Sequence, residues 1–288
     1  MGRFKNKVAV ITGAASGIGH GIVNRAVKEE MRLVLADIEE KALMKVEKEL
    51  NELGTDFLTV ITDVSKQKDI EELANKTIDK FGEVNLLFNN AGVAPTRISW
   101  EASLEDWKWI MDVNLWGVIH GCRSFIPIMI QQNNECHIVN TASLSGLMAN
   151  EMGQGMYIVT KYGVIGLTEI LEKELSMIKS KIKIHALCPG MVRTNIMDCE
   201  RNRPTELCVD QSERVVHPEL EQIEEAIAQM TEIGTSPDKV GDIVFEGIKA
   251  DLFYILTDTK LYLKRMIKDR MTRILDAYSK NKQIHKSI

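Results

Sequence analysis

This 288-residue chain has little of what membrane-spanning, secreted and metal-binding proteins require. No uninterrupted apolar run approaches the roughly 20 residues of a membrane-spanning helix, and the first residues contain no apolar signal region. Its five cysteines are odd in number and scattered, which is typical of reduced thiols, and its six histidines form no metal-ligand pattern. A net charge of −5 gives no reason to expect nucleic acid as a partner. We therefore expect a cytoplasmic protein with no metal site and no integral membrane segment.

The chain instead contains a regular alternation of strand-like and helix-like segments. Strands are predicted at Val8–Ile11, Leu33–Ala36, Phe57–Ile61, Asn85–Asn89, His137–Asn140, Ile182–Leu187 and Phe253–Leu256. Helices are predicted at Gly17–Glu29, Glu39–Leu53, Lys66–Phe81, Leu104–Gln131, Gly155–Ser180 and Pro237–Ala250. This alternation predicts an α/β protein with a seven-stranded parallel sheet and helices on both faces. No linker or repeat is visible, so a single domain over residues 1–288 is expected.

A glycine-rich turn follows the first predicted strand. Thr12 to Gly19 reads T-G-A-A-S-G-I-G, with the spacing G-x-x-x-G-x-G in place of the commoner dinucleotide pattern G-x-G-x-x-G. Glycines permit a tight turn and a close approach of the backbone to a pyrophosphate, which the N-terminus of the following helix stabilises. The strand, the glycine turn and the helix opening together indicate a dinucleotide site.

Tyr157 and Lys161 lie four residues apart in a predicted helix and so share one face of it. A phenol has a pKa of about 10, and a fixed positive charge beside it lowers this pKa toward the range of a general acid or base. The same pair would also suit the exposed face of an ordinary amphipathic helix. What favours chemistry is Ser143, because its hydroxyl follows a predicted strand and can donate to a substrate oxygen that the phenol also reaches.

With these features the chain resembles the short-chain dehydrogenase/reductase family, and its hydroxysteroid-dehydrogenase-like members in particular, from about residue 5 to residue 256. Matching motifs occur in family order at Thr12–Gly19, Asp63-Val64, Asn89-Asn90-Ala91-Gly92, Asn114, Ser143, Tyr157 with Lys161, and Pro189–Thr194. The resemblance implies a Rossmann-type doubly wound fold and an oxidoreductase that interconverts a secondary alcohol and a ketone. Ser143 and Tyr157 are fourteen residues apart, whereas thirteen is usual. Ser145 stays an alternative, although Ser143 fits the S-x-x-G frame better.

The resemblance also implies a role for each of four catalytic residues. Ser143 would hold and polarise the substrate oxygen, and Tyr157 would move the proton. Lys161 would lower the tyrosine pKa and bind the nicotinamide ribose, and Asn114 would anchor a proton-relay water. A non-catalytic dinucleotide-binding regulatory protein is the alternative from another class, but loss of the Tyr or the Lys would be its mark in the sequence.

The expected cofactor is NAD, with NADP as the alternative. Asp37 ends the second strand, where a carboxylate can accept hydrogen bonds from the adenosine ribose and would repel a 2′-phosphate. It could instead cap the next helix. Ser16 stands where NADP-preferring relatives often carry Arg or Lys, although Arg32 and Lys41 could still contribute charge. The full set that the resemblance assigns to cofactor binding is Gly13, Ser16, Gly17, Ile18, Gly19, Asp37, Asp63, Val64, Asn90, Ala91, Gly92, Tyr157, Lys161, Pro189, Gly190, Val192 and Thr194.

The segment Asn195–Ser236 is predicted to form a lid over the substrate. It mixes charges with an apolar series at helical spacing that includes Ile223 and Ile227. Methionines recur around the presumed cleft, and their flexible side chains suit an adaptable apolar pocket: Met148, Met152, Met156, Met191 and Met197. We expect a bulky apolar alcohol or ketone such as a steroid or bile acid. Other hydroxy-lipids, small cyclic ketones and 3-oxoacyl thioesters are the alternatives.

The last residues, 257–288, form a basic extension beyond the last predicted strand. From Lys260 onward they carry a net charge of +7, against −12 for the rest of the chain. Leu263, Ile267, Met271, Ile274 and Leu275 recur at helical spacing and predict an amphipathic helix docked on the body. An anionic membrane surface or an acidic substrate is a lesser alternative partner. The family resemblance implies a homotetramer or homodimer built through the helices predicted at Leu104–Gln131 and Gly155–Ser180.

Overall fold

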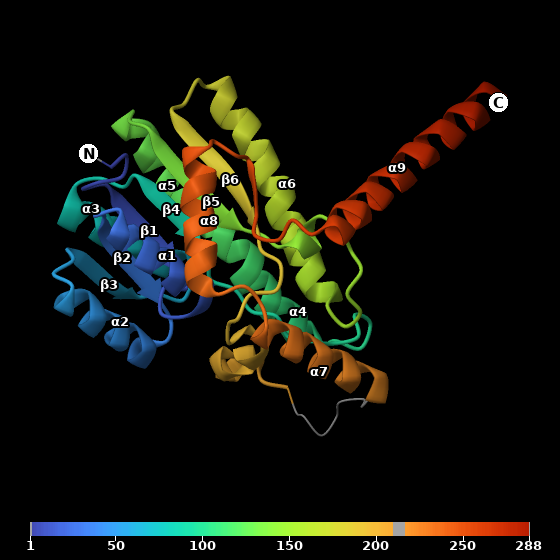
Figure 1. Cartoon of the computed structure of the whole chain (residues 1–288), viewed down its shortest axis with the longest axis horizontal. Helices are drawn as coiled ribbons and strands as arrows, with labels where there is room; N and C mark the ends of the chain where they lie inside the picture. The colour runs from blue at the N-terminus through green and yellow to red at the C-terminus, as the bar shows by residue number, and fades with distance from the viewer. Residues whose placement is uncertain (1, 210–216, 288) are drawn as a thin grey trace.

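A seven-stranded parallel sheet forms the centre of the computed structural model, which describes residues 2–209 and 217–287 (Figure 1). Its strands are β1 (Val8–Thr12), β2 (Arg32–Asp37), β3 (Phe57–Ile61), β4 (Leu86–Asn89), β5 (Cys136–Thr141), β6 (Ile182–Cys188) and β7 (Tyr254–Leu256). They pair in the order β3-β2-β1-β4-β5-β6-β7, and every pair is parallel. Each predicted strand is present with small shifts at its ends. The predicted fold class is therefore confirmed.

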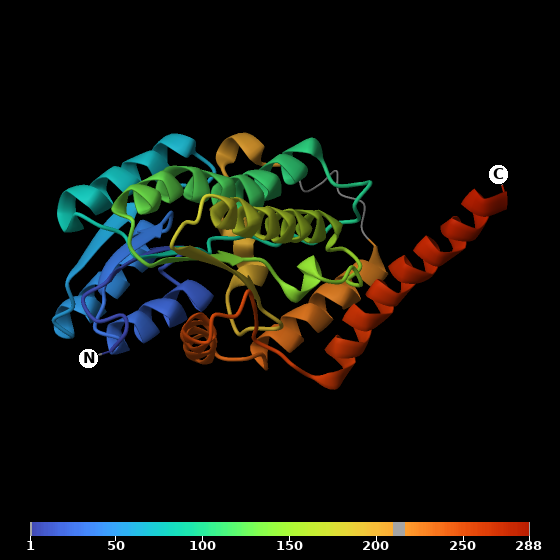
Figure 2. The same cartoon turned by 90° about the horizontal axis from the view of Figure 1, so that it is seen from above.

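Apolar side chains cover both faces of the sheet because successive strand residues point to opposite sides. In β1, Val8 and Val10 belong to one core cluster, whereas Ala9 and Ile11 belong to another. The first cluster lies under the helices α3 (Gln67–Phe81), α5 (Gly117–Gln132) and α6 (Gly155–Met177). The second lies under α1 (Gly17–Lys28), α2 (Glu40–Glu52) and α8 (Pro237–Lys249). Figure 2 shows the sheet between these two helix layers.

The long helix predicted at Leu104–Gln131 contains an interruption. It consists of α4 (Leu104–Met111), a π-helical turn η1 (Asp112–Trp116) and α5. This stretch, Leu104–Gln132, is long and apolar enough to cross a membrane by length and composition alone, because an 18-residue window within it has a mean hydropathy of 1.2. Charged residues such as Lys108, Asp112 and Arg123 interrupt it, so it contains no uninterrupted apolar run of the length that a membrane span needs. Burial accounts for the composition, because Val118, Phe125 and Met129 pack in the core against the sheet.

A long insertion separates β6 from β7. It contains two 3₁₀ helices, η3 (Ile196–Asn202) and η4 (Thr205–Leu207), followed by α7 (Pro218–Glu232). This is the region of the predicted lid, of which residues 210–216 lie outside the described part of the chain. A short parallel bridge between Val192 and Thr235 joins the two ends of the insertion, so the segment leaves the body and returns to it at nearly one point.

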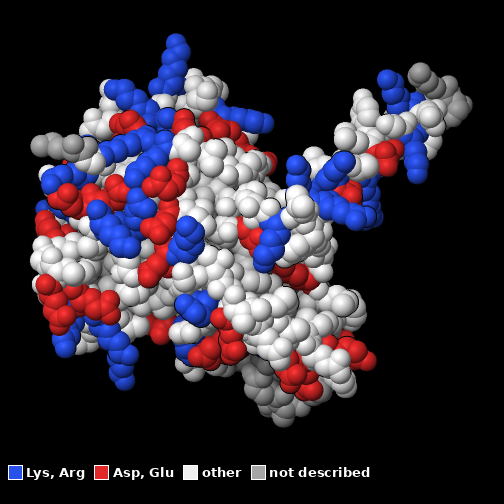
Figure 3. Space-filling view, viewed as in Figure 1, with Lys and Arg blue, Asp and Glu red and all other residues white. Residues whose placement is uncertain are grey.

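The C-terminal extension is helical but is not docked along the body as predicted. Helix α9 (Leu261–Ser287) packs through its first two turns only, where Leu263 is buried and Met266 and Ile267 contact the core. Beyond Arg270, whose guanidinium lies 5.0 Å from the Tyr162 ring centroid, the helix projects away from the body (Figures 1 and 2). Figure 3 shows basic side chains along this projecting part.

Candidate active site

A cleft of about 740 Å³ lies at the carboxyl ends of the strands. It spans the point where the strand order reverses, between β1 and β4, which is where ligands bind in open parallel sheets. The glycine turn after β1 lines one part of it, and the ends of β4, β5 and β6 line the rest. The insertion after β6 and the first turn of α9 close its outer side.

The glycine turn has the geometry that its sequence predicted. Gly13 has a φ of +65°, and a Cβ there would lie 2.9 Å from the Cα of Ala91. Gly19 is packed behind the turn, because a Cβ on it would lie 1.9 Å from the carbonyl oxygen of Gly13. Gly13, Ser16, Gly17 and Ile18 line the cleft, and Gly19 does not. Gly19 therefore shapes the turn from behind, through its packing against Gly13.

Asp37 faces the cleft at the end of β2 and is almost fully buried. Its Oδ2 accepts a hydrogen bond from the backbone N–H of Ala15 (2.9 Å) and its Oδ1 accepts one from that of Glu39 (3.0 Å). Burial raises the pKa of this carboxyl, and the backbone donors oppose the rise. Glu39, and not Asp37, occupies the N-cap position of α2. Asp37 thus ties the glycine turn to the start of α2 while its carboxylate faces the cleft.

Arg32 and Lys41, which were considered as cations beside the cofactor, do not line the cleft. The guanidinium of Arg32 is bound to Glu83 at 2.6 Å, and Lys41 is exposed on α2. The insertion supplies a cation that the sequence did not single out, because Arg201 lines the cleft close to Glu39.

The remaining predicted cofactor residues surround the cleft. Asp63 and Val64 follow β3, and the Asp63 carboxylate accepts hydrogen bonds from the backbone and hydroxyl of Ser65 rather than capping α3. Asn90 holds the turn after β4 against β1, because its Nδ2 donates to the carbonyl oxygen of Thr12 at 3.1 Å. All of the following line the cleft: Asp63, Val64, Asn90, Ala91, Gly92, Pro189, Gly190, Val192 and Thr194.

Ser143, Tyr157 and Lys161 come together on the floor of the cleft. Ser143 follows β5 and hydrogen-bonds the phenol of Tyr157, which projects from the first turn of α6. Lys161 lies one turn further along α6, with its Nζ 5.4 Å from the Tyr157 ring centroid. The same Nζ donates to the carbonyl oxygen of Thr141 at 2.9 Å, so the ammonium is fixed in place by the end of β5.

Burial dominates the electrostatics of this group. It raises the pKa of Tyr157 to about 12, with the Ser143 hydrogen bond acting in the opposite direction. It also lowers the pKa of Lys161 to about 8, because the charged ammonium is removed from water. The sequence predicted that Lys161 would lower the tyrosine pKa. In the structure burial of the phenol dominates, and the net shift of the Tyr157 pKa is upward, opposite in direction to that expectation.

The alternative serine, Ser145, points elsewhere. Its hydroxyl donates to the Glu151 carboxylate at 2.8 Å, and its backbone N–H donates to the Ser143 hydroxyl at 3.1 Å. Ser145 thus helps to hold Ser143, whereas Ser143 contacts the phenol. Glu151 also lines the cleft. The sequence did not predict this, because a carboxylate in a loop belongs to no motif with a recognisable spacing.

Asn114 lies inside the π-helical turn η1 and is completely buried. Its side chain donates to the Val93 carbonyl oxygen (2.8 Å) and to the Thr160 hydroxyl (3.2 Å), and it accepts from the Val93 N–H (2.8 Å). It does not line the cleft. A Cβ on Gly92 would lie 3.3 Å from its Oδ1 and 3.7 Å from the Nζ of Lys161, so both residues approach the same glycine.

The outer part of the cleft is lined by apolar side chains. Of the five methionines expected there, Met148, Met191 and Met197 line it, but Met156 is fully buried in a core cluster and Met152 is exposed outside it. Two further methionines from the insertion and α9 take their place, Met230 and Met266. Ile227 on α7 also lines the cleft, whereas Ile223 does not.

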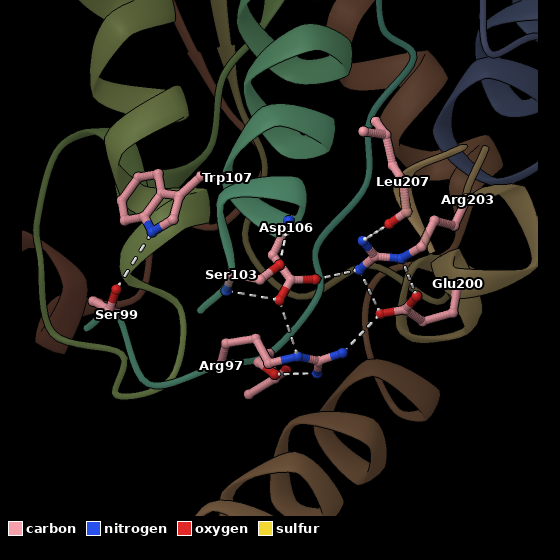
Figure 4. A network of polar contacts seen from close by, with 9 residues as sticks. Arg97, Ser99, Ser103, Asp106, Trp107, Glu200, Arg203 and Leu207 are labelled. Carbon is pink, nitrogen blue, oxygen red and sulfur yellow. Dashed lines mark hydrogen bonds and ion pairs between the residues drawn. The ribbon is translucent and has the colours of Figure 1, made fainter. Parts of the chain in front are cut away.

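An ion-pair network fixes the start of the insertion to the body (Figure 4). Arg203 donates to Asp106 at 2.6 Å and to Glu200 at 2.6 Å, and its guanidinium lies 4.2 Å from the Trp109 ring centroid. Arg97 donates to the other oxygen of Glu200 at 2.9 Å. The side chains of Arg203 and Asp106 are almost fully buried, so each charge depends on the other for its solvation. The segment containing η3 and η4 is therefore anchored on α4.

Known proteins share both the sequence and the fold. A family model described as short chain dehydrogenase matches residues 7–204. A protein of Lactiplantibacillus plantarum named CLA biosynthesis dehydrogenase/reductase is 35% identical over 277 residues. These residues are 96% of this chain and 95% of that protein. The 3beta-hydroxysteroid dehydrogenase 2 of Eggerthella lenta is 36% identical over 192 residues, 66% of this chain and 72% of its own.

A solved structure supports the same comparison over nearly the whole fold. The crystal structure of a short chain dehydrogenase/reductase from Burkholderia phymatum in complex with NAD is 38% identical. It matches with a TM-score of 0.89 and covers 95% of this chain and 96% of its own.

Proposed function

The chain belongs to the short-chain dehydrogenase family of NAD(P)-dependent oxidoreductases, and we propose that it interconverts a bulky apolar secondary alcohol and its ketone with NAD as the cofactor. The observation that carries the proposal is the contact of Ser143, Tyr157 and Lys161 on the floor of a cleft that begins at the glycine turn. A family member kept only for cofactor binding would have no need of this arrangement.

The cleft fits a dinucleotide at two separate points. The glycine turn leaves backbone exposed where side chains would otherwise block a pyrophosphate. It leads directly into α1, whose N-terminus favours negative charge. Asp37 offers a carboxylate at the adenosine end, where it suits the two ribose hydroxyls of NAD and disfavours the 2′-phosphate of NADP. Gly13, Ser16, Gly17, Asp63, Val64 and Thr194 would hold the dinucleotide between these ends. Once bound, the nicotinamide would accept or supply the hydride.

The protein would contribute orientation and proton transfer. Ser143 would donate a hydrogen bond to the substrate oxygen and hold it against Tyr157. Because burial keeps the phenol protonated at neutral pH, Tyr157 is poised to donate a proton during ketone reduction. Lys161, fixed by the Thr141 carbonyl, would stabilise the phenolate that remains. Asn114 would act by holding the Val93 backbone and Thr160 in place around this group.

An apolar substrate is supported by the side chains around the outer cleft. Met148, Met191, Met197, Met230 and Met266 line it together with Ile227 and Leu263. Flexible thioethers adapt to large apolar surfaces, and Leu263 and Met266 bring the first turn of α9 into the same wall. We propose that residues 195–236 act as the substrate lid, and that a steroid-sized or similarly bulky hydroxy-lipid is the substrate.

We also propose a cytoplasmic homodimer or homotetramer. All five cysteines are free thiols, which suits a reducing compartment. On α6, Val159 and Ile170 are each 47% exposed, and apolar side chains turned outward on one helix suit a subunit contact. Analytical ultracentrifugation of the full chain tests the assembly.

A substrate panel tests the proposed activity. NADH oxidation would be followed by absorbance with steroid ketones, bile acids, other oxo-lipids, a 3-oxoacyl thioester and small cyclic ketones. We expect the highest kcat/KM for a bulky apolar ketone. The control is Tyr157→Phe, which should reduce kcat by about 10²–10⁴-fold while NADH binding is retained, because only the transferable proton is removed. Turnover that survives this change at the wild-type rate would exclude Tyr157 as the acid.

A further inference from the structure

A polar contact joins the insertion to the start of α2 across the outer side of the cleft. Arg201 donates to Oε1 of Glu39 at 2.8 Å, and Asn202 donates to the same oxygen at 2.9 Å. The donors come from the end of η3 and the acceptor from the N-cap of α2, 162 residues away in the sequence. All three residues line the cleft, beside Asp37.

Two contacts made by neighbouring residues at the C-terminal end of η3 differ in burial. At Arg203, just beyond η3, the buried ion pair with Asp106 ties the insertion to α4. At Glu39 the contact is half-exposed, with 29% of each side chain of the Glu39–Arg201 pair open to solvent. Ion pairs of this exposure are individually weak, whereas breaking a buried pair is costly. The buried pair of Arg203 thus holds the backbone at this point, whereas the side chains of Arg201 and Asn202 can leave Glu39 without moving it.

The contact of Glu39 with Arg201 and Asn202 lies beside Asp37, in the part of the cleft assigned above to adenosine. Glu39 is two residues from Asp37, and its backbone N–H donates to Asp37 Oδ1. Burial opposes ionisation of Glu39, but the hydrogen bonds from Asn202 and Arg201 and the charge of Arg201 lower its pKa, so the carboxylate is charged at neutral pH.

Resting on the proposed cofactor site, we propose that Glu39, Arg201 and Asn202 form a clasp that must open for the dinucleotide to enter and leave. A gate that has to open in both directions scales the rates of association and dissociation equally and leaves Kd unchanged. A residue that binds the dinucleotide directly would instead change Kd, mainly through the dissociation rate. These two kinetic patterns separate a clasp from an ordinary cofactor contact.

The test uses the full-length protein and NADH. Stopped-flow fluorescence would give kon from direct mixing and koff from displacement by excess NAD. We expect Glu39→Gln and Arg201→Met each to raise both rates about three- to tenfold, equivalent to ~0.6–1.4 kcal/mol, with Kd changed less than twofold. The double variant should resemble either single variant, because one contact is lost in each. Asn202→Ala should give a smaller change in the same direction.

The matched control is Glu40→Gln, which removes the same charge one residue further along α2 from an exposed side chain that does not line the cleft. Its rates should equal those of the wild type. Rates in Glu39→Gln no faster than in this control, or a rise in koff with a proportional rise in Kd, would contradict the clasp. A wild-type protein that binds no NADH would contradict the proposed function itself, and the clasp with it.

Discussion

At the scale of single residues, Lys161 combines a functional position with an unfavourable environment. The ammonium is buried, and it has one hydrogen bond, to the Thr141 carbonyl oxygen, among the described contacts. Its pKa of about 8 is well below that of a lysine in water because desolvation penalises the charged form. Proteins tolerate the desolvation of a charged group at sites where the charge is needed for chemistry, although it lowers their stability.

The lowered pKa of Lys161 predicts a particular dependence of stability on pH. Between its folded value of about 8 and the usual value near 10.4, the unfolded chain binds more protons at this residue than the folded chain does. The wild type should therefore gain stability relative to Lys161→Met as pH rises from 8 to 10, by about 2 kcal/mol. Urea unfolding of both proteins at pH 7, 8, 9 and 10 gives this difference directly.

The difference between the two proteins is informative because other titrating groups cancel in it. Below pH 7 it should be constant. A difference that stays flat from pH 8 to 10, or that moves in the opposite direction, would mean that Lys161 is not desolvated in solution.

Asp37 gives a second residue-scale prediction. Asp37→Asn keeps the shape of the side chain and one acceptor oxygen, so one of the Ala15 and Glu39 donors loses its partner, and it removes the negative charge from the adenosine end. The ratio of kcat/KM with NADH to that with NADPH should fall about tenfold or more, since repulsion of the 2′-phosphate is lost. Steady-state kinetics with both cofactors measures the ratio. A wild type that already prefers NADPH would indicate that Arg201 outweighs the carboxylate.

The residues of the site differ in how far the sequence could predict them. The choice of Ser143 over Ser145 followed from the S-x-x-G frame, and the hydrogen bond to Tyr157 agrees with it. Glu39 and Arg201 could not be paired in advance, because neither belongs to a motif and their contact depends on how the insertion folds back. The pKa of Tyr157 was misjudged because burial cannot be read from a four-residue spacing.

At the scale of elements, α7 presents different side chains to the cleft and to its surroundings. Ile227 lines the cleft, whereas Ile223, one turn earlier, is half-buried outside it. Lids are drawn from the less stable parts of a fold because they must open for exchange. The anchor at Arg203 and Asp106 confines any such movement to the part of the insertion beyond η4.

This arrangement predicts that two chemically identical changes on α7 act differently. Ile227→Asp should raise KM for a steroid-sized ketone about tenfold or more, and change KM for a small cyclic ketone little, because only the larger substrate reaches α7. Ile223→Asp is the matched control and should leave both values near those of the wild type. Equal losses on both ketones in Ile227→Asp, with a lowered melting temperature, would place this side chain in the permanent core.

The apolar periodicity of the sequence did not predict two features of the helices. The π-helical turn at Asp112–Trp116 inserts an extra residue into one helical turn, and the apolar pattern on either side of it continues without a visible break. The apolar spacing of α9 correctly predicted a helix, but not that its stripe would leave the body after Ile267. Helical spacing identifies an apolar face and does not identify what covers it.

At the scale of the whole molecule, the parallel sheet was predictable because its strands are short, apolar and separated by helical segments. Right-handed crossovers leave few arrangements for such a pattern. The position of the cleft then follows from the sheet, since the carboxyl ends of β1 and β4 meet where the order reverses. The direction in which α9 projects does not follow from the sheet, and only the three-dimensional structure shows it (Figure 1).

The projecting helix also predicts how the body responds to truncation. Removing residues 272–288 deletes exposed side chains such as Leu275 and Tyr278, and it spares Leu263 and Met266. The melting temperature should change by less than about 2 °C, because little apolar area buried in the body is lost. Differential scanning calorimetry at several protein concentrations measures this.

A longer deletion is the control for that truncation. Removing residues 263–288 also takes away Leu263 and Met266, which line the cleft and pack on the core, so both the melting temperature and NADH-linked turnover should fall. A large, concentration-dependent loss of stability from the shorter deletion would contradict the prediction and indicate that the outer helix is buried between subunits.

The distribution of thiols makes the insertion accessible to spectroscopy without cysteine engineering. Burial raises the pKa values of Cys122 and Cys188 to about 12 and those of Cys136 and Cys199 to about 11, so these four are shielded from alkylation. Cys208 is exposed directly after η4, four residues beyond Pro204, which lines the cleft. A maleimide fluorophore should therefore attach at a single position, and its emission would report movements of the insertion in the native sequence.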